Sequence, residues 1–119
     1  MAKLLRVAVV GSRNFNSYKL LDAYLYEYFA PFKLISGGAS GADSLAEEFA
    51  RRRDLKTKIY KANWKKYGKR AGFVRNEKIV KNCDVVVAFW DGESKGTKMT
   101  IDLARKIGLK VYVVMFPGE

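Results

Sequence analysis

The sequence predicts an α/β fold, a single Rossmann-like domain in which helices cover both faces of a five-stranded parallel sheet in three layers. Five short apolar segments alternate with four segments whose apolar residues recur at helical spacing. The apolar runs at 7–10, 85–89 and 111–114 are nearly continuous, which is typical of strands covered on both faces. With 119 residues and no linker, repeat or low-complexity stretch, the chain is expected to form one domain over 1–119.

The five expected strands occupy residues 5–10, 33–35, 58–60, 84–90 and 110–116. Alternation of strands and helices along the chain implies parallel strands joined by right-handed crossovers, and we predict the strand order 3-2-1-4-5. In such sheets, ligands bind beyond the carboxyl ends of the strands, near the point where the strand order reverses. We therefore expect function in the loops that follow the strands.

The four expected helices each have an apolar stripe on one side. The stripes consist of Leu21, Leu25, Tyr28 and Phe29; Ala42, Leu45, Ala46, Phe49 and Ala50; Phe73, Ile79 and Val80; and Thr100, Leu103, Ala104 and Ile107. Ser17 fits an N-cap for the first helix, and Gly108 stands where a left-handed residue ends the fourth.

Glycine and small hydroxyl residues are concentrated in the loops after the first, second and fourth strands, at 11–13, 36–41 and 91–97. Glycine lets backbone N–H groups approach an anion closely, and a helix start adds a favourable dipole. The loops therefore predict binding of the phosphates of a nucleotide-derived small molecule. The second loop lacks both the Walker Gly-Lys-Ser/Thr ending and the Gly-x-Gly-x-x-Gly spacing of dinucleotide sites.

The candidate ligand-binding residues come from these loops and from the segment before the fourth strand. They are Gly11, Ser12, Arg13, Ser36, Gly37, Gly38, Gly41, Asp43, Trp64, Arg75, Asn76, Asp91, Ser94, Gly96 and Thr97. Some have a structural alternative: Ser40 with Asp43 matches a capping box, Ser94 fits an N-cap, and Gly11 fits a tight turn. Arg13 is better explained as a clamp on phosphate or carboxylate, because its planar fork suits those groups.

The composition excludes several kinds of chemistry. The chain has no histidine, which removes Ser-His-Asp and Cys-His catalysis and most zinc sites. Its single cysteine, Cys83, excludes an internal disulfide and a thiolate-rich metal cluster, so neither a metal nor a cofactor is expected. Besides Asp43, only Asp91 and Glu93 remain as carboxylates for chemistry. No apolar run approaches the roughly 20 residues that span a membrane, so we expect a cytoplasmic protein with no membrane partner.

The net charge of +11 is concentrated in one segment. Residues 51–81 contain thirteen lysines and arginines against two acidic residues and alone carry a net +11. This distribution favours a polyanionic or phosphate-rich partner over a generic solubilising surface. Trp64 and Tyr67 lie in a predicted loop of this segment and are candidates for base stacking, whereas Tyr60 and Phe73 are assigned to the core.

Four blocks of sequence occur in a characteristic order: VVGSRxF at 9–15, SGGAxGAD at 36–43, WxxYGxxAGxxRN at 64–76 and DxxxAFWDGxSxGT at 84–97. Together they resemble the YspA/cpYpsA-related branch of the SLOG superfamily over nearly the whole chain. The resemblance implies a Rossmannoid domain that binds nucleotides or nucleotide-derived ligands. The superfamily includes the LOG phosphoribohydrolases, which cleave a base from a nucleoside 5′-monophosphate, and the DNA-binding DprA/SMF proteins.

The resemblance to LOG enzymes is incomplete at their catalytic residues. Arg75 falls on the position of the LOG arginine, but Thr100 stands where those enzymes have glutamate. A sensing or binding role is therefore the leading hypothesis, and enzymatic activity stays open. The alternatives are an N-glycoside hydrolase that uses Arg75 with Asp91 or Glu93, and single-stranded nucleic-acid binding through residues 51–81.

A homo-oligomer, dimer or higher, is also expected. SLOG relatives often pair, and the first helix carries more aromatic surface than one core stripe needs. Its tyrosines are Tyr18, Tyr24, Tyr26 and Tyr28.

Overall fold

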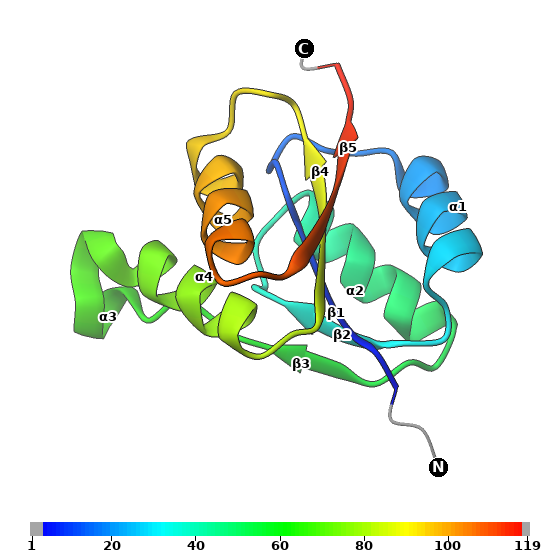
Figure 1. Cartoon of the computed structure of the whole chain (residues 1–119), viewed down its shortest axis with the longest axis horizontal. Helices are drawn as coiled ribbons and strands as arrows, with labels where there is room; N and C mark the ends of the chain where they lie inside the picture. The colour runs from blue at the N-terminus through cyan, green and yellow to red at the C-terminus, as the bar shows by residue number, and fades with distance from the viewer. Residues whose placement is uncertain (1–3, 118–119) are drawn as a thin grey trace.

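The strands pair in the order that the sequence predicts. The computed structural model describes residues 4–117, whose five strands form one parallel sheet in the order β3-β2-β1-β4-β5. The elements are β1 (Arg6–Gly11), α1 (Tyr18–Tyr28), β2 (Lys33–Ser36), α2 (Ala42–Arg52), β3 (Thr57–Ile59), α3 (Trp64–Tyr67), the 3₁₀ helix η1 (Gly68–Arg70), α4 (Ala71–Lys81), β4 (Val85–Trp90), α5 (Lys95–Lys106) and β5 (Lys110–Met115). Helices α1 and α2 cover one face of the sheet, and α4 and α5 cover the other (Figure 1). The predicted three-layer Rossmann-like fold is confirmed.

Two apolar clusters fill the spaces between the layers. Successive side chains of β1 point to opposite faces, so Val7 and Val9 pack towards α1 and α2 while Ala8 and Val10 pack towards α4 and α5. Burial of both sets explains the unbroken apolar run of this strand. Within residues 4–117, no helix is long and apolar enough to cross a membrane.

The last strand departs from the prediction that both of its faces are covered. Strand β5 lies at the sheet edge, and its residues are partly buried or exposed, with Tyr112 and Met115 its exposed large apolar side chains. Within the described part of the chain, no further strand pairs with its outer side. An apolar run alone does not distinguish such an edge strand from a central one.

Helix ends follow local capping chemistry in most places. The Ser17 hydroxyl accepts the Leu20 N–H at 3.3 Å, and Gly108 adopts a φ of 87° after α5. The predicted Ser40–Asp43 capping box is wrong. Gly41, rather than Ser40, is the N-cap of α2, so the helix starts one residue later than the capping box requires. Gly41 adopts a φ of 72° and has no side chain that could cap the helix.

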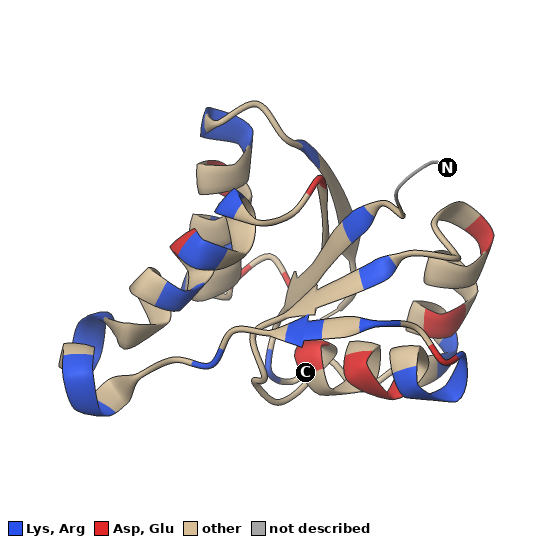
Figure 2. Ribbon diagram, turned by 90° about the horizontal axis from the view of Figure 1, so that it is seen from below, with Lys and Arg blue, Asp and Glu red and all other residues tan. Residues whose placement is uncertain are grey.

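The basic segment contains a short helix that the sequence interpretation assigned to a loop. Helix α3 is capped by Asn63, whose Oδ1 accepts the Lys66 N–H at 3.0 Å, and it runs through η1 into α4. Helix α3 and η1 project away from the sheet (Figure 1), and Lys and Arg make up four of their seven residues (Figure 2). Phe73 is 41% exposed rather than in the core, because the buried side of α4 is formed by other residues, including Ile79 and Val80.

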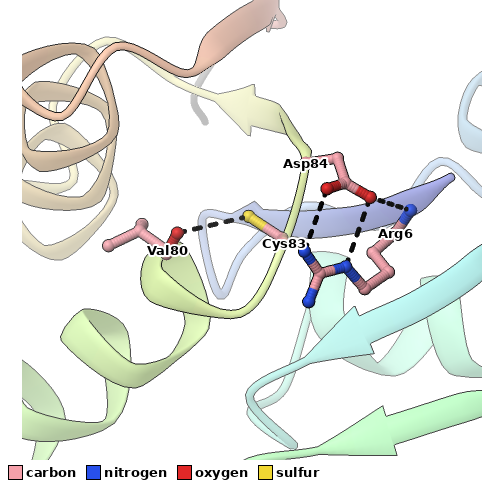
Figure 3. Close-up of polar contacts among 4 residues, drawn as sticks. All are labelled: Arg6, Val80, Cys83 and Asp84. Atoms are coloured by element: carbon pink, nitrogen blue, oxygen red, sulfur yellow. Dashed lines mark hydrogen bonds and ion pairs between the residues drawn. The ribbon is translucent and has the colours of Figure 1, made fainter.

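An ion pair joins Arg6, the first residue of β1, to Asp84, the residue that precedes β4 (Figure 3). The Arg6 guanidinium donates to both carboxylate oxygens of Asp84 at 3.0 and 3.2 Å, and the Arg6 backbone N–H donates to the same carboxylate at 2.8 Å. The neighbouring Cys83 is buried, and its thiol donates to the Val80 carbonyl. These contacts lie at the amino ends of the strands, opposite the glycine-bearing loops.

Candidate functional site

A cavity of about 440 Å³, called the main cavity here, lies beyond the carboxyl ends of β1 and β4. These neighbouring strands mark the point where the strand order reverses. Its predicted ligand-binding residues are Gly11, Ser12, Arg13, Asp43, Arg75, Asn76, Asp91, Ser94, Gly96 and Thr97. Loops from three strands and helix α4 thus converge on one space.

A second space of about 370 Å³, called the outer hollow, adjoins the main cavity. The two spaces share Arg13, Ala39 and Arg75 as lining residues. The outer hollow adds Gly37, Gly38, Ser40, Lys61, Ala62 and Trp64. Residues predicted from the second loop and from the basic segment therefore meet here.

Three predicted residues line neither space. Ser36 is buried beneath its loop, where its hydroxyl donates to Glu47 at 2.6 Å and accepts the Gly38 N–H at 3.3 Å. Gly41 packs against the loop after β1, and a Cβ there would overlap the carbonyl oxygens of Ser12 and Arg13. Glu93 is exposed beside Asp91. Ser36 and Gly41 therefore stabilise the conformations of the loops that line the site, and neither of them lines the two spaces.

Gly96 differs from the glycines that the fold itself requires. A Cβ at Gly11 would overlap the Phe89 carbonyl oxygen, so glycine is needed there for packing. A Cβ at Gly96 would meet no heavy atom within 4 Å, and its φ lies outside the left-handed region. Gly96 lines the main cavity in the first turn of α5, so its lack of a side chain leaves open space at a helix N-terminus.

Arg75 is a fixed cation between the two spaces. Its Nη1 donates to the Gly37 carbonyl and its Nε donates to Asn76 Oδ1, both at 2.7 Å. Burial lowers the pKa of this guanidinium, although Asp43 partly opposes the shift. A guanidinium withdrawn from water and held in one orientation is well suited to a phosphate oxygen.

Asp43 is a buried carboxyl at the base of the second loop. Its Oδ2 accepts the Ala39 N–H at 3.2 Å, which anchors the loop from the first turn of α2. Burial raises the pKa of Asp43 to about 6, while the Ala39 N–H and the positive charge of Arg75 oppose this rise. Asp43 therefore titrates within two pH units of neutrality.

Asp91 has the opposite electrostatic environment. Its Oδ1 accepts the backbone N–H groups of Glu93 and Ser94, each at 2.9 Å, and these bonds lower its pKa. The Asp91 N–H donates to the Ser12 hydroxyl at 3.2 Å, which ties the loops after β1 and β4 together. An ionised carboxylate suits a sugar hydroxyl or a developing positive charge better than it suits proton donation.

Hydroxyl groups line the side of the main cavity formed by α5. Ser94 caps this helix, as predicted, and its Oγ lies 3.0 Å from Thr97 Oγ1. The hydroxyl of Thr100, the residue that the resemblance aligns with the LOG glutamate, donates to the Gly96 carbonyl at 3.1 Å. Thr100 also lines the cavity, to which it brings a hydroxyl group and no carboxylate.

Sequence interpretation missed several lining residues. In the main cavity these include Asn14 and Ile79, and in the outer hollow Lys61 and Ala62. Asn14 directly follows Arg13, and Ile79 lies one helical turn after Arg75 on the same side of α4. Both positions were signalled by a neighbouring candidate. Lys61 was indistinguishable from the other lysines of its segment.

The chain matches the family described as "YspA, cpYpsA-related SLOG family" over residues 5–67. It is 34% identical over 116 residues to the Gene 61 protein of Mycobacterium phage D29, a match that covers 89% of this chain and 93% of the phage protein.

Two solved structures share the fold. DNA processing protein A (DprA) from Streptococcus pneumoniae superposes with a TM-score of 0.80 at 21% identity, over 98% of this chain and 51% of that chain. DNA processing protein A from Helicobacter pylori, described for its single-stranded DNA binding mode, gives 0.71 at 23% identity, over 93% and 65%. This chain thus spans less than two-thirds of either structure's length. From the family match and the phage relative, the chain belongs to the YspA/cpYpsA-related SLOG family.

Proposed function

We propose that the protein binds a nucleotide or nucleotide-derived ligand in the main cavity and acts as a binding or sensing domain. One observation carries this proposal: the loops after β1, β2 and β4 and two arginines from separate elements line two adjoining spaces that share both arginines. Arg13 and Arg75 would hold phosphate oxygens, together with backbone N–H groups at the start of α5. Asp91 and the hydroxyls of Ser94 and Thr97 would contact the sugar.

Gly96 allows a test of this assignment that leaves the fold intact. Gly96→Ala adds one methyl group to the cavity lining without a clash, and alanine favours a helix over glycine by about 1 kcal/mol. Gly72→Ala is a matched control, since Gly72 is also the second residue of a helix but lines neither space. We expect Gly96→Ala to weaken AMP binding at least about tenfold, and Gly72→Ala to leave it unchanged.

Isothermal titration calorimetry with AMP measures both variants, and thermal melting checks their folding. If wild-type protein gives no saturable binding of AMP, or if Gly96→Ala binds it as tightly, the assignment is wrong. Chromatography of the same mixtures tests the hydrolase alternative, which uses Arg75 with Asp91 or Glu93, because release of free adenine would support catalysis over binding alone.

Single-stranded nucleic acid is a second candidate ligand, favoured by the charge of the projecting α3–η1 segment. Lys65, Lys66, Lys69 and Arg70 are all exposed there. Figure 2 shows this projecting part of the ribbon mostly in the blue of Lys and Arg. The Helicobacter pylori structure with the same fold was described for single-stranded DNA binding. Each phosphate contact should contribute about 0.7 to the slope of log affinity against log salt.

A charge-matched pair of triple variants tests this second candidate with oligo(dT). Replacing Lys65, Lys66 and Lys69 with glutamine should reduce the salt slope by about 2. The control replaces Lys98, Lys106 and Lys110, which are also exposed but lie outside the basic segment. Equal slopes in the two variants would show that general positive charge, rather than this segment, attracts the strand.

A further inference from the structure

The main cavity and the outer hollow form two compartments on either side of Arg13 and Arg75. Each volume falls within the roughly 300–1,000 Å³ typical of small-molecule sites, so each is large enough for one nucleotide-sized group. We infer that the ligand has two linked units, and that the second unit, a planar base with its phosphate, lies in the outer hollow against Lys61 and Trp64. This inference rests on the proposed function, which places the first unit in the main cavity.

The two compartments differ in charge. The main cavity combines two arginines with the carboxylates of Asp43 and Asp91. Among the described residues that line the outer hollow, none is acidic, and Lys61 joins the same two arginines there. Phosphate groups are therefore stabilised most at the junction and on its outer side, while the carboxylates suit uncharged hydroxyl groups on the inner side.

Trp64 borders the outer compartment alone. It lines the outer hollow but not the main cavity, and 55% of its surface is exposed. A base stacked on this indole therefore belongs to a part of the ligand outside the main cavity. Stacking of this kind is worth about 1–3 kcal/mol per base and tolerates any base.

Backbone contacts place these two side chains beside the second loop. The Tyr60 N–H donates to the Ser36 carbonyl at 2.8 Å, so the chain leaves β3 next to the glycines of that loop, and Lys61 follows immediately. Asn63 then caps α3, of which Trp64 is the first residue. The outer hollow is thus built by ordered elements on each side.

The test compares AMP with two adenine dinucleotides, pApA, which has a phosphodiester link, and AppA, which has a pyrophosphate link. We expect at least one dinucleotide to bind wild-type protein about tenfold more tightly than AMP. Trp64→Leu and Lys61→Gln should each lower the ratio of dinucleotide to AMP affinity about tenfold. Lys110→Gln, which removes an exposed charge on β5, should leave this ratio unchanged. Circular dichroism checks that the variants remain folded.

The outcomes separate this inference from the proposed function. If AMP binds as tightly as both dinucleotides, or if Trp64→Leu weakens AMP and dinucleotide binding equally, the ligand has one unit and the inference is wrong while the proposed function stands. If neither AMP nor the dinucleotides bind, the proposed function fails as well. Preference for pApA identifies the end of a strand as the ligand type, and preference for AppA identifies a pyrophosphate-linked small molecule; both support two units.

Discussion

Replacing Asp43 with asparagine tests the electrostatics of the second loop directly. The substitution keeps the size of the side chain and an oxygen that can accept the Ala39 N–H, but it removes the ionisable group. Burial raises the pKa of Asp43 from 3.8 to about 6. At 1.36 kcal/mol per pKa unit, this difference corresponds to about 3 kcal/mol of pH-dependent stability.

The sign follows from which state binds the proton more tightly. Because the folded-state pKa is raised, protonation of Asp43 favours the folded protein, and its contribution is fully present below pH 4. This contribution is lost as the pH rises through about 6. Relative to wild type, the Asp43→Asn variant should therefore gain about 3 kcal/mol of unfolding free energy between pH 3.5 and pH 7.

Urea denaturation of both proteins across this pH range gives the measurement. Subtracting one stability curve from the other cancels the groups that the two proteins share. Asp102→Asn provides a control, because it removes the same formal charge from an exposed position on α5. One contrary result is a difference in unfolding free energy that does not change with pH for Asp43→Asn, and another is a change no larger than that of the control. Either result would refute the interpretation that burial raises the pKa of Asp43.

Three further predictions concern parts of the molecule outside the site. Arg6→Ala should lower the melting temperature by only a few degrees, because the pair with Asp84 is exposed, and should leave AMP affinity unchanged; a change in affinity would contradict its remote position. The Cys83 thiol, whose pKa burial raises to about 11, should react with iodoacetamide at pH 8 far more slowly in folded than in urea-unfolded protein, as mass spectrometry can show; equal rates would contradict its burial. We also propose that a second copy of the chain covers an aromatic strip formed by Tyr28, Tyr24, Phe29 and Tyr112, because these rings contact one another in series while Tyr28 and Tyr112 remain 63% and 38% exposed. Light scattering should show an oligomer that Tyr28→Lys weakens, and a wild-type monomer at high concentration would exclude it.

Strand order and the region of the candidate site were predictable because both follow from short-range patterns. Apolar runs in β1 and β4 marked strands buried on both faces, and parallel strands end at the same edge of a sheet. Glycines in three loops therefore indicated one location. Strand β5 shows the limit, since a strand at the edge can carry the same apolar run as a central one.

Individual roles depended on tertiary contacts that no local pattern contains. Asp43 resembled a capping residue, but its carboxylate binds a backbone group that precedes the helix. Gly41 resembled a residue that contacts an anion, whereas its small size admits the backbone of the first loop. Lys61 gained its position only from the path of the chain after β3. In each case the decisive neighbour is distant along the sequence or lies on another element.

The backbone of the first loop rests directly on Gly41, and the Ser12 hydroxyl accepts a hydrogen bond from the loop after β4. Three loops from distant parts of the chain thereby support one another through direct contacts. A site that is preorganised in this way would lose little conformational entropy on binding the proposed ligand. We therefore expect the proposed ligand to bind fast to nearly rigid loops. Selectivity should then be set by the shape and charge of the site rather than by closure of the loops around the ligand.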